Sequence, residues 1–599
     1  MLHFLWLIAH LAPAIMSPDA NGYVAQGRLL AEEGRTSFSP TSPAQYVGMH
    51  WLETTDGVFH SRYPAGLPLL FAAAWKIGGL DAALFINPLL ASATLLFVFL
   101  LGRRLMRESF AAIAAAVMAT IPVVNQHALD ADAHVAAMFF LTGGVWALLR
   151  FADTRAAHLG LLAGVMLGMI PTVRYPEAII GLTVAAWLLW RVRPWAQTWP
   201  AVVGAALPIG VLCLHNASAY GAFWRTGYAL TNEQTGFGLG YFAAHFLPYL
   251  QALGGQGLSL FFAFGTAGLA ALAIGAGRRS EGLLFTGIVL PLVLLYMAYY
   301  FGGGPGAAGG NLRFLIPTFP FFAIAGAWLL AQMAVHLGRA GQAAVVVVIA
   351  IQGAIGIGTT VQTLTRAKSS LKAAAGMRAL AEKEIPAGSV IILDRQLAES
   401  LDAVGGWKLV EESLLGGGPG AGFGRGGPGP GGRGGAFRPM GGELPGGGPD
   451  PDAPNPMQRG KNRAQQERYT GLGGEERRER VWADVVKWAG GKPIFWFARS
   501  LDAVENTLPR GADYRSIAET DTPTMFGPGG AGPGAQAPAG MAGGRGGRGP
   551  GGMAGPMGGP GGGGRPGMRG AMQGMPGGRG GPADLPSAKL RLVQITPPS

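Results

Sequence analysis

The chain has little charge and a single cysteine, Cys213, among its 599 residues. One cysteine cannot form a disulfide framework or a cysteine metal site within one chain. Charged residues make up 13% of the chain, where globular proteins carry roughly 25%. Hydrophobic residues make up 49% and mean hydropathy is +0.29. This composition is typical of a membrane protein.

The basic residues of the chain do not cluster on one predicted folded face. The net charge is +12, which by itself is typical of nucleic-acid partners. The basic residues are instead spread over short loops between apolar runs and over late Gly-rich tracts. We therefore expect no nucleic-acid partner and predict the lipid bilayer as the surrounding medium.

Long apolar runs fill the chain as far as residue 362. A helix needs about 20 apolar residues to cross the hydrocarbon core, and the runs predict about eleven spans. The runs lie at 1–16, 83–101, 110–124, 133–149, 158–172, 178–190, 200–214, 248–275, 282–300, 315–335 and 342–361. A further apolar stretch at 66–77 is short, and we interpret it as a helix in the membrane interface. The predicted first domain, 1–362, is a polytopic helical membrane domain.

Arginines fix the predicted orientation, because short cytoplasmic loops carry an excess of Lys and Arg. Every second loop is basic, and its arginines include Arg103, Arg104, Arg150, Arg191, Arg278 and Arg339. The remaining loops, 17–66, 125–132, 215–247 and 301–314, are then extracytoplasmic. The expected location is the inner (plasma) membrane, with everything after residue 362 outside the cytoplasm.

Several residues that are costly to place in hydrocarbon stand at the outer ends of the runs. Asp19 follows the first run, and Tyr23 shares its face if a helix runs on to Arg28. Asp130 and Asp132 precede the fourth run; their two-residue spacing points them to nearly opposite sides, and only Asp132 is expected to face inward. Each also has a plainer explanation. The acids could be helix caps, the arginines Arg174 and Arg313 could extend to lipid headgroups, and the tyrosines could belong to the aromatic belt.

The order of these features resembles the GT-C-type glycosyltransferases, including the protein mannosyltransferases and the lipid A aminoarabinose transferases. The residues that carry the resemblance are Asp19, Tyr23, Ala25 and Gly34, then the segment RYPAGLP from Arg62 and Tyr63 to Pro68, then LDADAHVAAMFF with Asp130, Asp132 and His134, and finally RFLIP from Arg313. The segment 216–228 also resembles the outer loop of bacterial members. The resemblance covers residues 1–362.

The resemblance implies transfer of a sugar from a polyprenyl-phosphate donor to an unknown glycan, lipid or protein acceptor. A carboxylate suits the base that takes the acceptor proton, and we assign this role to Asp19, with Asp132 as the second acid. Arginine forks suit the departing phosphate. We expect substrate contacts from Tyr23, Arg62, Tyr63, Asp130, His134, Arg174, Tyr175 and Arg313.

Cofactor use is left open by the same residues. Many relatives have two adjacent acids in the first loop, whereas here Asp19 is followed by Ala20. We therefore do not expect paired carboxylates to hold a metal at that point, although Glu32, Glu33 or Glu53 could substitute. No cofactor is assigned, and a divalent cation is compatible with the residues.

Residues 363–599 predict a soluble extracytoplasmic α/β domain. Apolar segments at 389–394, 492–499 and the terminal KLRLVQIT are typical of strands, and they alternate with helical patterns, which favours a largely parallel sheet. Gly/Pro/Arg/Met-rich insertions at 415–460 and 526–583 cannot bury enough apolar surface to order themselves. RGG repeats also occur in proteins that bind single-stranded nucleic acids, but aromatic residues are nearly absent from these tracts, so we predict disordered insertions.

Two other functional classes are compatible with parts of the chain. A transporter or flippase for lipid-linked glycans is the main alternative, but such proteins have internal repeats and broken helices at mid-membrane, and no repeat is evident here. An RNA-binding membrane anchor would require the Gly-rich tail to be cytoplasmic. The sequence names neither the donor sugar nor the acceptor.

Overall fold

The computed structural model describes residues 1–15, 17–231, 233–275, 277–302, 311–416, 463–523 and 589–598. The predicted insertions 415–460 and 526–583 lie outside the described residues, except for residues 415 and 416. The division of the chain at residue 362 stays a prediction.

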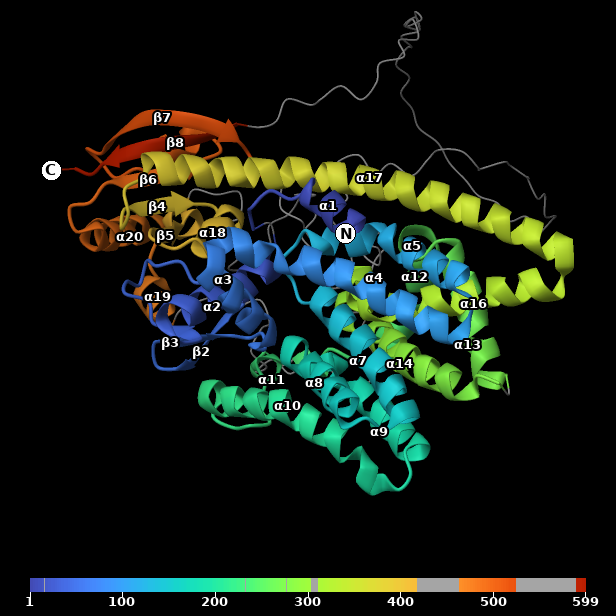
Figure 1. Ribbon diagram of the computed structural model, residues 1–599. Coiled ribbons are helices and arrows are strands. Elements are labelled where there is room, and N and C mark those ends of the chain that lie inside the picture. The colour runs from blue at the N-terminus through green and yellow to red at the C-terminus, as the bar shows by residue number, and fades with distance from the viewer. Residues whose placement is uncertain are drawn as a thin grey trace, which may run out of the picture. The chain divides into compact units, whose positions relative to one another are not determined.

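Helices make up most of the chain as far as Glu384 (Figure 1). The first group comprises α1 (Leu2–Ile8), α2 (Pro18–Glu33), α3 (Gly66–Leu84), α4 (Ile86–Leu105), α5 (Glu108–Ala119), α6 (Pro122–Ala128), α7 (His134–Thr154), α8 (Ala157–Val173), η1 (Pro176–Ile179), α9 (Ile180–Arg191), η2 (Trp195–Thr198) and α10 (Trp199–Tyr220). The second comprises α11 (Gly227–Leu230), η3 (Glu233–Thr235), α12 (Leu239–Ala252), η4 (Leu253–Gly257), α13 (Leu260–Ile274), α14 (Arg279–Met297), η5 (Tyr300–Gly302), η6 (Leu312–Thr318), α16 (Phe319–His336) and α17 (Gly338–Glu384).

The number of candidate spans is lower than predicted. Among the described residues, 7 helices are long and apolar enough to cross a membrane, or up to 9 if two bent helix pairs each count as one span. The prediction of eleven was therefore too high. Several apolar runs fold into helices that are too short: α1 has 7 residues, and α9 has 12 residues, which is a length of about 18 Å.

The bent pairs explain part of the same difference. The pair α5 and α6 turns by 64°, and the pair formed by Leu239–Gly257 and α13 turns by 115°. The stretch predicted as a short interfacial helix at 66–77 instead continues to Leu84 as α3, with a break at Gly78 and Gly79. It thereby meets the length and composition of a candidate span.

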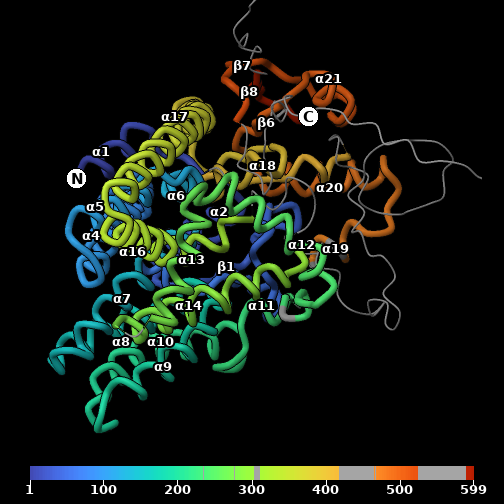
Figure 2. The backbone as a smooth tube through the Cα atoms, turned by 90° about the vertical axis from the view of Figure 1, so that its right-hand side faces the viewer, coloured from blue at the N-terminus to red at the C-terminus, as the bar shows by residue number. Residues whose placement is uncertain are grey.

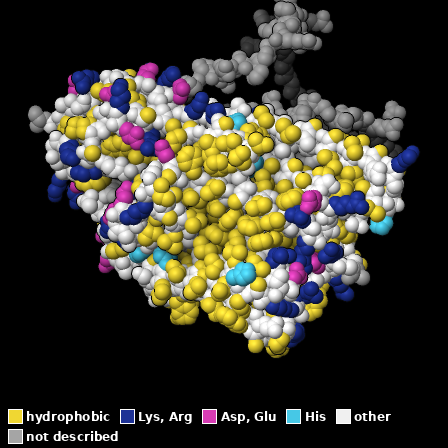
Figure 3. Space-filling model, viewed as in Figure 1, with side chains coloured by type: hydrophobic (Ala, Val, Ile, Leu, Met, Phe, Trp, Pro, Cys, Tyr) yellow, Lys and Arg dark blue, Asp and Glu magenta, His cyan; other side chains and the backbone are white. Residues whose placement is uncertain are grey.

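The surface fits a multi-pass membrane protein. On the face seen in Figure 3, hydrophobic side chains cover the middle of the helical part, while Lys and Arg side chains gather to both sides of this area. Exposed apolar residues in α10 and α17 include Val202, Leu207, Val346 and Ile355. In a membrane such side chains contact lipid, so their exposure needs no protein partner.

Tight helix contacts depend on small residues, as is usual where lipid supplies no hydrophobic drive between helices. A Cβ built on Gly164 of α8 would lie 2.1 Å from the Ala201 carbonyl oxygen of α10. A Cβ on Gly204 of α10 would lie 2.3 Å from the Leu161 carbonyl oxygen. Glycine therefore sets how closely α8 and α10 approach.

The last candidate span is part of a much longer helix. With 47 residues, α17 is about 70 Å long, and residue 362 lies inside it. Figures 1 and 2 both show α17 beside α16 and α5, and Figure 1 shows it reaching the strands. The helix predicted after residue 362 is thus continuous with the last apolar run.

A small segment before α3 forms a sheet that the sequence analysis did not predict. It contains β1 (Ser37–Phe38), β2 (Trp51–Thr55) and β3 (Val58–Ser61) in the order β1-β3-β2, and both pairs are antiparallel. Gly57 supplies the positive φ of 71° in the turn between β2 and β3, a conformation that glycine adopts without strain. This small sheet leads directly to Arg62 and Tyr63.

The chain ends in a sheet of five strands with the order β5-β4-β6-β8-β7. The elements are β4 (Val390–Leu393), α18 (Arg395–Asp402), β5 (Lys408–Glu411), η7 (Glu412–Leu415), α19 (Arg463–Tyr469), α20 (Gly474–Ala489), β6 (Ile494–Ala498), α21 (Leu501–Glu505), β7 (Asp513–Asp521) and β8 (Lys589–Thr596). The predicted strands at 389–394 and 492–499 and at the terminus are confirmed as β4, β6 and β8.

This sheet is mixed, which corrects the prediction of a largely parallel one. Strands β5, β4 and β6 run parallel, whereas β8 is antiparallel to both β6 and β7. β7 was missed because it is an edge strand of polar residues, DYRSIAETD, with most side chains exposed or half-buried. One face packs Leu397 of α18 and Met377 of α17, and the other packs Trp482 and Val485 of α20.

Candidate active site

Asp19 occupies the first turn of α2 and is not its cap. The N-cap is Ser17, whose Oγ accepts a hydrogen bond of 3.1 Å from the Ala20 N–H, and Pro18 follows at the first helical position. Both choices are those that sequences favour at a helix start. Because Ser17 caps the helix, the Asp19 carboxylate is left for contacts outside α2.

Three side chains from three other segments converge on the Asp19 carboxylate. The Tyr63 hydroxyl donates a hydrogen bond of 2.6 Å to Oδ1, and Nε2 of His50 lies 3.1 Å from the same oxygen. A guanidinium nitrogen of Arg313, in η6, lies 3.3 Å from Oδ2. The Asp19 side chain keeps 22% of its surface exposed, so a substrate can still reach it.

These contacts determine the charge of Asp19. Burial alone would raise the pKa of its carboxyl, but the Arg313 guanidinium and the hydrogen bonds from His50 and Tyr63 hold that pKa well below its usual range. Burial and the neighbouring Asp19 carboxylate raise the pKa of Tyr63 well above its usual range, which keeps the phenol protonated as a donor. Asp19 is therefore ionised at neutral pH.

Arg62 lies beside the same tyrosine. One of its terminal nitrogens donates to Glu233 at 2.7 Å and the other to the Tyr63 hydroxyl at 3.3 Å. The Tyr63 ring stacks on Tyr23 with ring centres 4.4 Å apart. Tyr23 and Asp19 of α2 thus contact the same tyrosine, as expected for residues on one helix face. The result is a chain of contacts from Arg62 through Tyr63 and Asp19 to Arg313.

The three candidate arginines differ in how many donors they have left. Nε of Arg62 and Nε of Arg313 are buried and have no hydrogen-bond partner among the described residues. Arg174, in contrast, uses all three nitrogens: it contacts Glu177, the Tyr296 hydroxyl and His134. A buried donor without a partner is costly, and Arg62 and Arg313 hold such donors next to Asp19.

Arg174 belongs to a buried ion-pair network. Glu177 is 0% exposed and receives hydrogen bonds from both Arg174 and the Tyr296 hydroxyl. His134 lies 3.4 Å from Arg174. Tyr175 points elsewhere, since its hydroxyl donates to Oδ1 of Asn216 at 3.1 Å.

Both acids before α7 face inward, which corrects the prediction that only Asp132 does. Asp130 is 6% exposed and Asp132 is 2% exposed. Since α7 begins at His134, the acids lie in a turn, and the alternation assumed for a regular element does not apply. They are linked to Asp19 through Ser17, whose hydroxyl donates to Asp130 at 3.1 Å.

His127 completes a cluster with these two acids that the sequence analysis missed. The ligand atoms of His127, Asp130 and Asp132 all lie within 4.8 Å of one another, and all three residues are buried. Burial and the nearby Asp132 raise the pKa of Asp130 to about 7. A divalent cation would reduce the repulsion between the Asp130 and Asp132 carboxylates, and imidazole with two carboxylates is a suitable ligand set. These residues could hold a cation, which would act there as a fixed positive charge.

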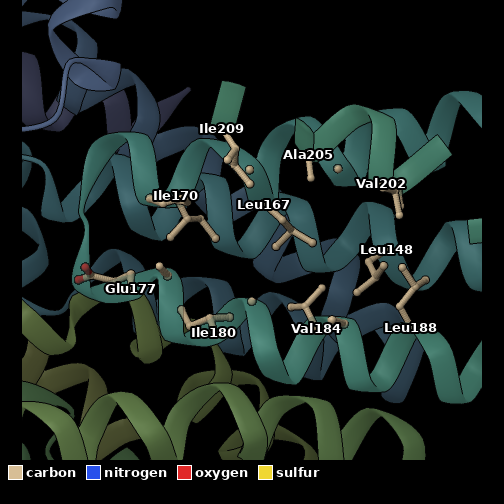
Figure 4. A pocket seen from close by; sticks show the side chains of 17 residues that line it. Leu148, Leu167, Ile170, Glu177, Ile180, Val184, Leu188, Val202, Ala205 and Ile209 are labelled. Carbon is tan, nitrogen blue, oxygen red and sulfur yellow. The ribbon is translucent and has the colours of Figure 1, made fainter. Parts of the chain in front are cut away.

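An apolar groove runs between α8, α9 and α10 (Figure 4). It holds about 300 Å³ and is lined by Leu167, Ile180, Val184 and other aliphatic side chains. Glu177 lies at one end of the groove, as Figure 4 shows, and Arg174 contacts that carboxylate. The groove thus leads from the apolar part of the helices to the polar cluster.

All ten predicted site residues lie at one end of the helices and are connected by contacts. The links that complete the set are the ring contacts of Tyr228 with Tyr63 and Tyr175, and of Phe314 with His134. The residues that sequence reasoning missed are His50, His127, Glu177, Glu233, Tyr228 and Tyr296. Glu177 is an acid directly before an apolar run, a signal that could have found it. His50 lies in an irregular loop and Glu233 lies away from the apolar runs, so neither gives such a signal.

Residues 64–215 match the family model described as dolichyl-phosphate-mannose-protein mannosyltransferase. The match includes Asp130, Asp132, His134, Arg174 and Tyr175, while Asp19, Arg62 and Arg313 lie outside it. No curated protein matches the chain.

Solved structures show likeness at low identity. ArnT from Cupriavidus metallidurans bound to undecaprenyl phosphate is 14% identical, with a TM-score of 0.46, covering 68% of this chain and 84% of that one. The oligosaccharyltransferase AglB from Archaeoglobus fulgidus, in complex with an inhibitory peptide and a dolichol-phosphate, is 13% identical, with a TM-score of 0.43, covering 83% of this chain and 68% of that one.

The family match confirms the resemblance predicted from the sequence, and the prediction of an enzyme with it. The transporter alternative gains no support from a match to transferases. The chain has the candidate spans of a multi-pass membrane protein, and over residues 64–215 it is similar to the dolichyl-phosphate-mannose-protein mannosyltransferases, a family of membrane glycosyltransferases.

Proposed function

We propose that the chain transfers a sugar from a polyprenyl-phosphate donor to an acceptor hydroxyl at the site around Asp19. The observation that carries the proposal is the contact chain Arg62–Tyr63–Asp19–Arg313, in which a carboxylate stands between two arginines with unused buried donors. Such donors match the oxygens of a phosphate. In this proposal the carboxylate takes the acceptor proton.

In the proposed reaction, the acceptor oxygen attacks the anomeric carbon and the bond from this carbon to the phosphate oxygen breaks. Polyprenyl phosphate leaves with the bonding electrons, and Asp19 takes the acceptor proton. The donor phosphate also changes Asp19, because it competes for Arg313. Once Arg313 turns to the phosphate, the pKa of Asp19 rises and the carboxylate becomes a stronger base.

We propose that part of the lipid chain of the donor lies in the groove of Figure 4, because the groove is apolar along its length and ends near the polar cluster. Cations at the opposite end of the helices support an outward-facing site. There Arg104 of α4 pairs with Asp153 of α7 and Glu281 of α14, and basic ends are typically cytoplasmic. We propose that the site is extracytoplasmic, in the inner membrane, with the residues after 362 on the same side.

The test uses purified full-length protein in liposomes and a panel of polyprenyl-phosphate sugars, with released polyprenyl phosphate as the readout. Arg62→Gln and Arg313→Gln each remove a charged donor, worth about 1.5–3 kcal/mol. We expect the KM for the donor to rise about 10- to 100-fold in each variant. Arg339→Gln, at an exposed position, is the control. An unchanged KM in both variants would show that the donor phosphate does not bind to Arg62 and Arg313.

Gly227 gives a second test, because it holds the backbone of Arg62. A Cβ built on Gly227 would lie 2.3 Å from the Arg62 carbonyl oxygen and 2.5 Å from its Cα. Gly227→Ala must therefore displace Arg62, and a shift of about 1 Å can cost about 10²-fold in rate. Gly210→Ala in α10, where nothing lies within 4 Å, should leave turnover unchanged. Equal turnover in both variants would show that the position of Arg62 is unimportant.

A further inference from the structure

The five-stranded sheet and its helices touch the start of α2 directly. Asn21 is 1% exposed and lies two residues after Asp19. Its side-chain N–H groups donate to the Glu399 carbonyl oxygen at 2.9 Å and to Oδ2 of Asp402 at 3.2 Å. Ser400 donates in addition to the Ile15 carbonyl oxygen at 2.7 Å. Helix α18 thereby holds the chain on both sides of Asp19.

A second connection runs through residues 39–50, which we call the bridging loop. The Tyr46 N–H donates to the Leu409 carbonyl oxygen of β5 at 2.7 Å. Gln465 donates to the Gln45 carbonyl oxygen at 2.8 Å, and Trp488 donates to the Thr41 hydroxyl at 2.9 Å. Ala44 packs on one face of the five-stranded sheet and Tyr46 on the other. The bridging loop is therefore anchored along its length.

The bridging loop ends at the candidate active site. Its last residue, His50, is 4% exposed and brings Nε2 to 3.1 Å from Oδ1 of Asp19. The His50 carbonyl oxygen also accepts a hydrogen bond of 2.8 Å from the Arg62 N–H. One residue of the loop thus contacts the proposed base and the backbone of a proposed phosphate ligand.

We propose that the domain formed by the five-stranded sheet and its helices is a working part of the site, which positions Asp19 through two positioning residues, Asn21 and His50. This inference rests on the proposed function of Asp19. Neither residue needs to touch the substrate: Asn21 fixes the helix turn that carries the carboxylate, and His50 fixes its direction. A reacting group must be held to within a fraction of an ångström, and supporting hydrogen bonds supply this.

The first experiment separates positioning from stability. Asn21→Leu keeps the branching and the number of heavy atoms of the side chain but removes both hydrogen bonds to α18. Ser400→Ala is a milder change that removes the neighbouring hydrogen bond from α18 to the Ile15 carbonyl oxygen. We expect kcat to fall about 10- to 100-fold in Asn21→Leu, with the KM for the donor unchanged, since Arg62 and Arg313 stay in place. The control is Trp482→Phe, which removes a buried hydrogen bond of 2.9 Å to the Thr507 carbonyl oxygen, far from α2 in the chain.

The second experiment follows the titration of Asp19, which a purely structural role of His50 would not change. The His50 hydrogen bond lowers the pKa of Asp19, so its loss in His50→Ala raises that pKa, and the acidic limb of the kcat profile moves to higher pH. His50→Gln supplies a new N–H donor and should restore the profile. The groups facing Asp19 are Arg313, His50 and Tyr63, with Tyr23, Asp130 and His134 nearby.

A readout without turnover keeps this proposal distinct from the proposed function. The pH dependence of carbodiimide labelling of Asp19, followed by mass spectrometry, reports protonation of the carboxyl in the full-length protein. We expect the same upward shift in His50→Ala even if no donor in the panel is turned over. An unshifted labelling profile, or equal kcat in Asn21→Leu, Ser400→Ala and wild type, would overturn the proposal.

Discussion

Replacing Asp19 with Asn should lower the rate of sugar transfer by about 10²- to 10⁴-fold, the usual contribution of a general base. Asn keeps the shape of the side chain and can still accept the hydrogen bond from Tyr63, but it cannot take the acceptor proton. Donor binding should stay within a few-fold of wild type or become tighter, because Arg313 loses the carboxylate that it contacts at 3.3 Å. The measurement is polyprenyl phosphate release at saturating donor, together with the donor Kd.

The control for this prediction is Asp81→Asn. Asp81 also pairs with an arginine, Arg378 at 3.2 Å, but its side chain is 57% exposed, and it should be dispensable for turnover. If Asp19→Asn kept its rate within a few-fold of wild type, the base would lie elsewhere, and Asp132→Asn would be the next variant to measure. Loss of turnover in both Asp19→Asn and Asp132→Asn, with normal thermal stability, would assign the chemistry to Asp19 and Asp132 together.

The low pKa of Asp19 determines what the pH profile should look like. In the protein without donor, Asp19 is ionised across the neutral range because Arg313, His50 and Tyr63 favour the charged form. Activity that needs the carboxylate is therefore present above that depressed pKa and is lost as the pH falls through it. A donor phosphate that draws Arg313 away would move this acidic limb of kcat upward relative to that of kcat/KM.

The sequence was sufficient to predict that the candidate site residues lie together at one end of the helices. Asp19, Arg62, Asp132 and Arg313 each follow or precede an apolar run, and charge is costly in hydrocarbon, so their positions along the chain predicted a common surface. Their contacts confirm that they lie together. The order of the same residues also indicated a resemblance to the family whose model matches residues 64–215.

The partners of these residues could not be predicted in the same way. His50 reaches Asp19 from an irregular loop, and Glu233 reaches Arg62 from a segment 171 positions away. Neither contact leaves a periodic signal, because no regular element relates the two positions. The span number failed for a related reason: apolar runs show that a segment is buried in lipid or protein, but not whether it crosses straight, as α7 does, or bends, as α5 and α6 do.

Removing one partner of the Arg174–Glu177 pair should give the largest loss of stability. Arg174 is 5% exposed and Glu177 is 0% exposed, so Arg174→Leu leaves a buried carboxylate without its cation. Such a change costs about 3–5 kcal/mol. The double variant Arg174→Leu with Glu177→Leu removes both charges and should recover most of that loss. The free energy of unfolding in mild detergent measures both.

A matched ion pair on the surface tests whether burial explains the large loss of stability expected at the Arg174–Glu177 pair. Arg103 and Glu108 are 2.7 Å apart, but their side chains are 48% and 70% exposed. Removing either should change the stability by only about 0–1 kcal/mol. Equal losses at the two pairs would contradict the view that the Arg174 network is expensive to break because it is desolvated.

The double variant also decides what Arg174 does for the substrate. Sequence reasoning placed it among the phosphate ligands, whereas the structure shows its nitrogens occupied by Glu177, Tyr296 and His134. If Arg174 only stabilises the packing of the helices at the end of the groove, the donor Kd of the stable double variant should lie within a few-fold of that of the wild type. If the donor Kd instead rises by about 10-fold or more, as expected for a lost charged contact, Arg174 must leave Glu177 to bind the phosphate.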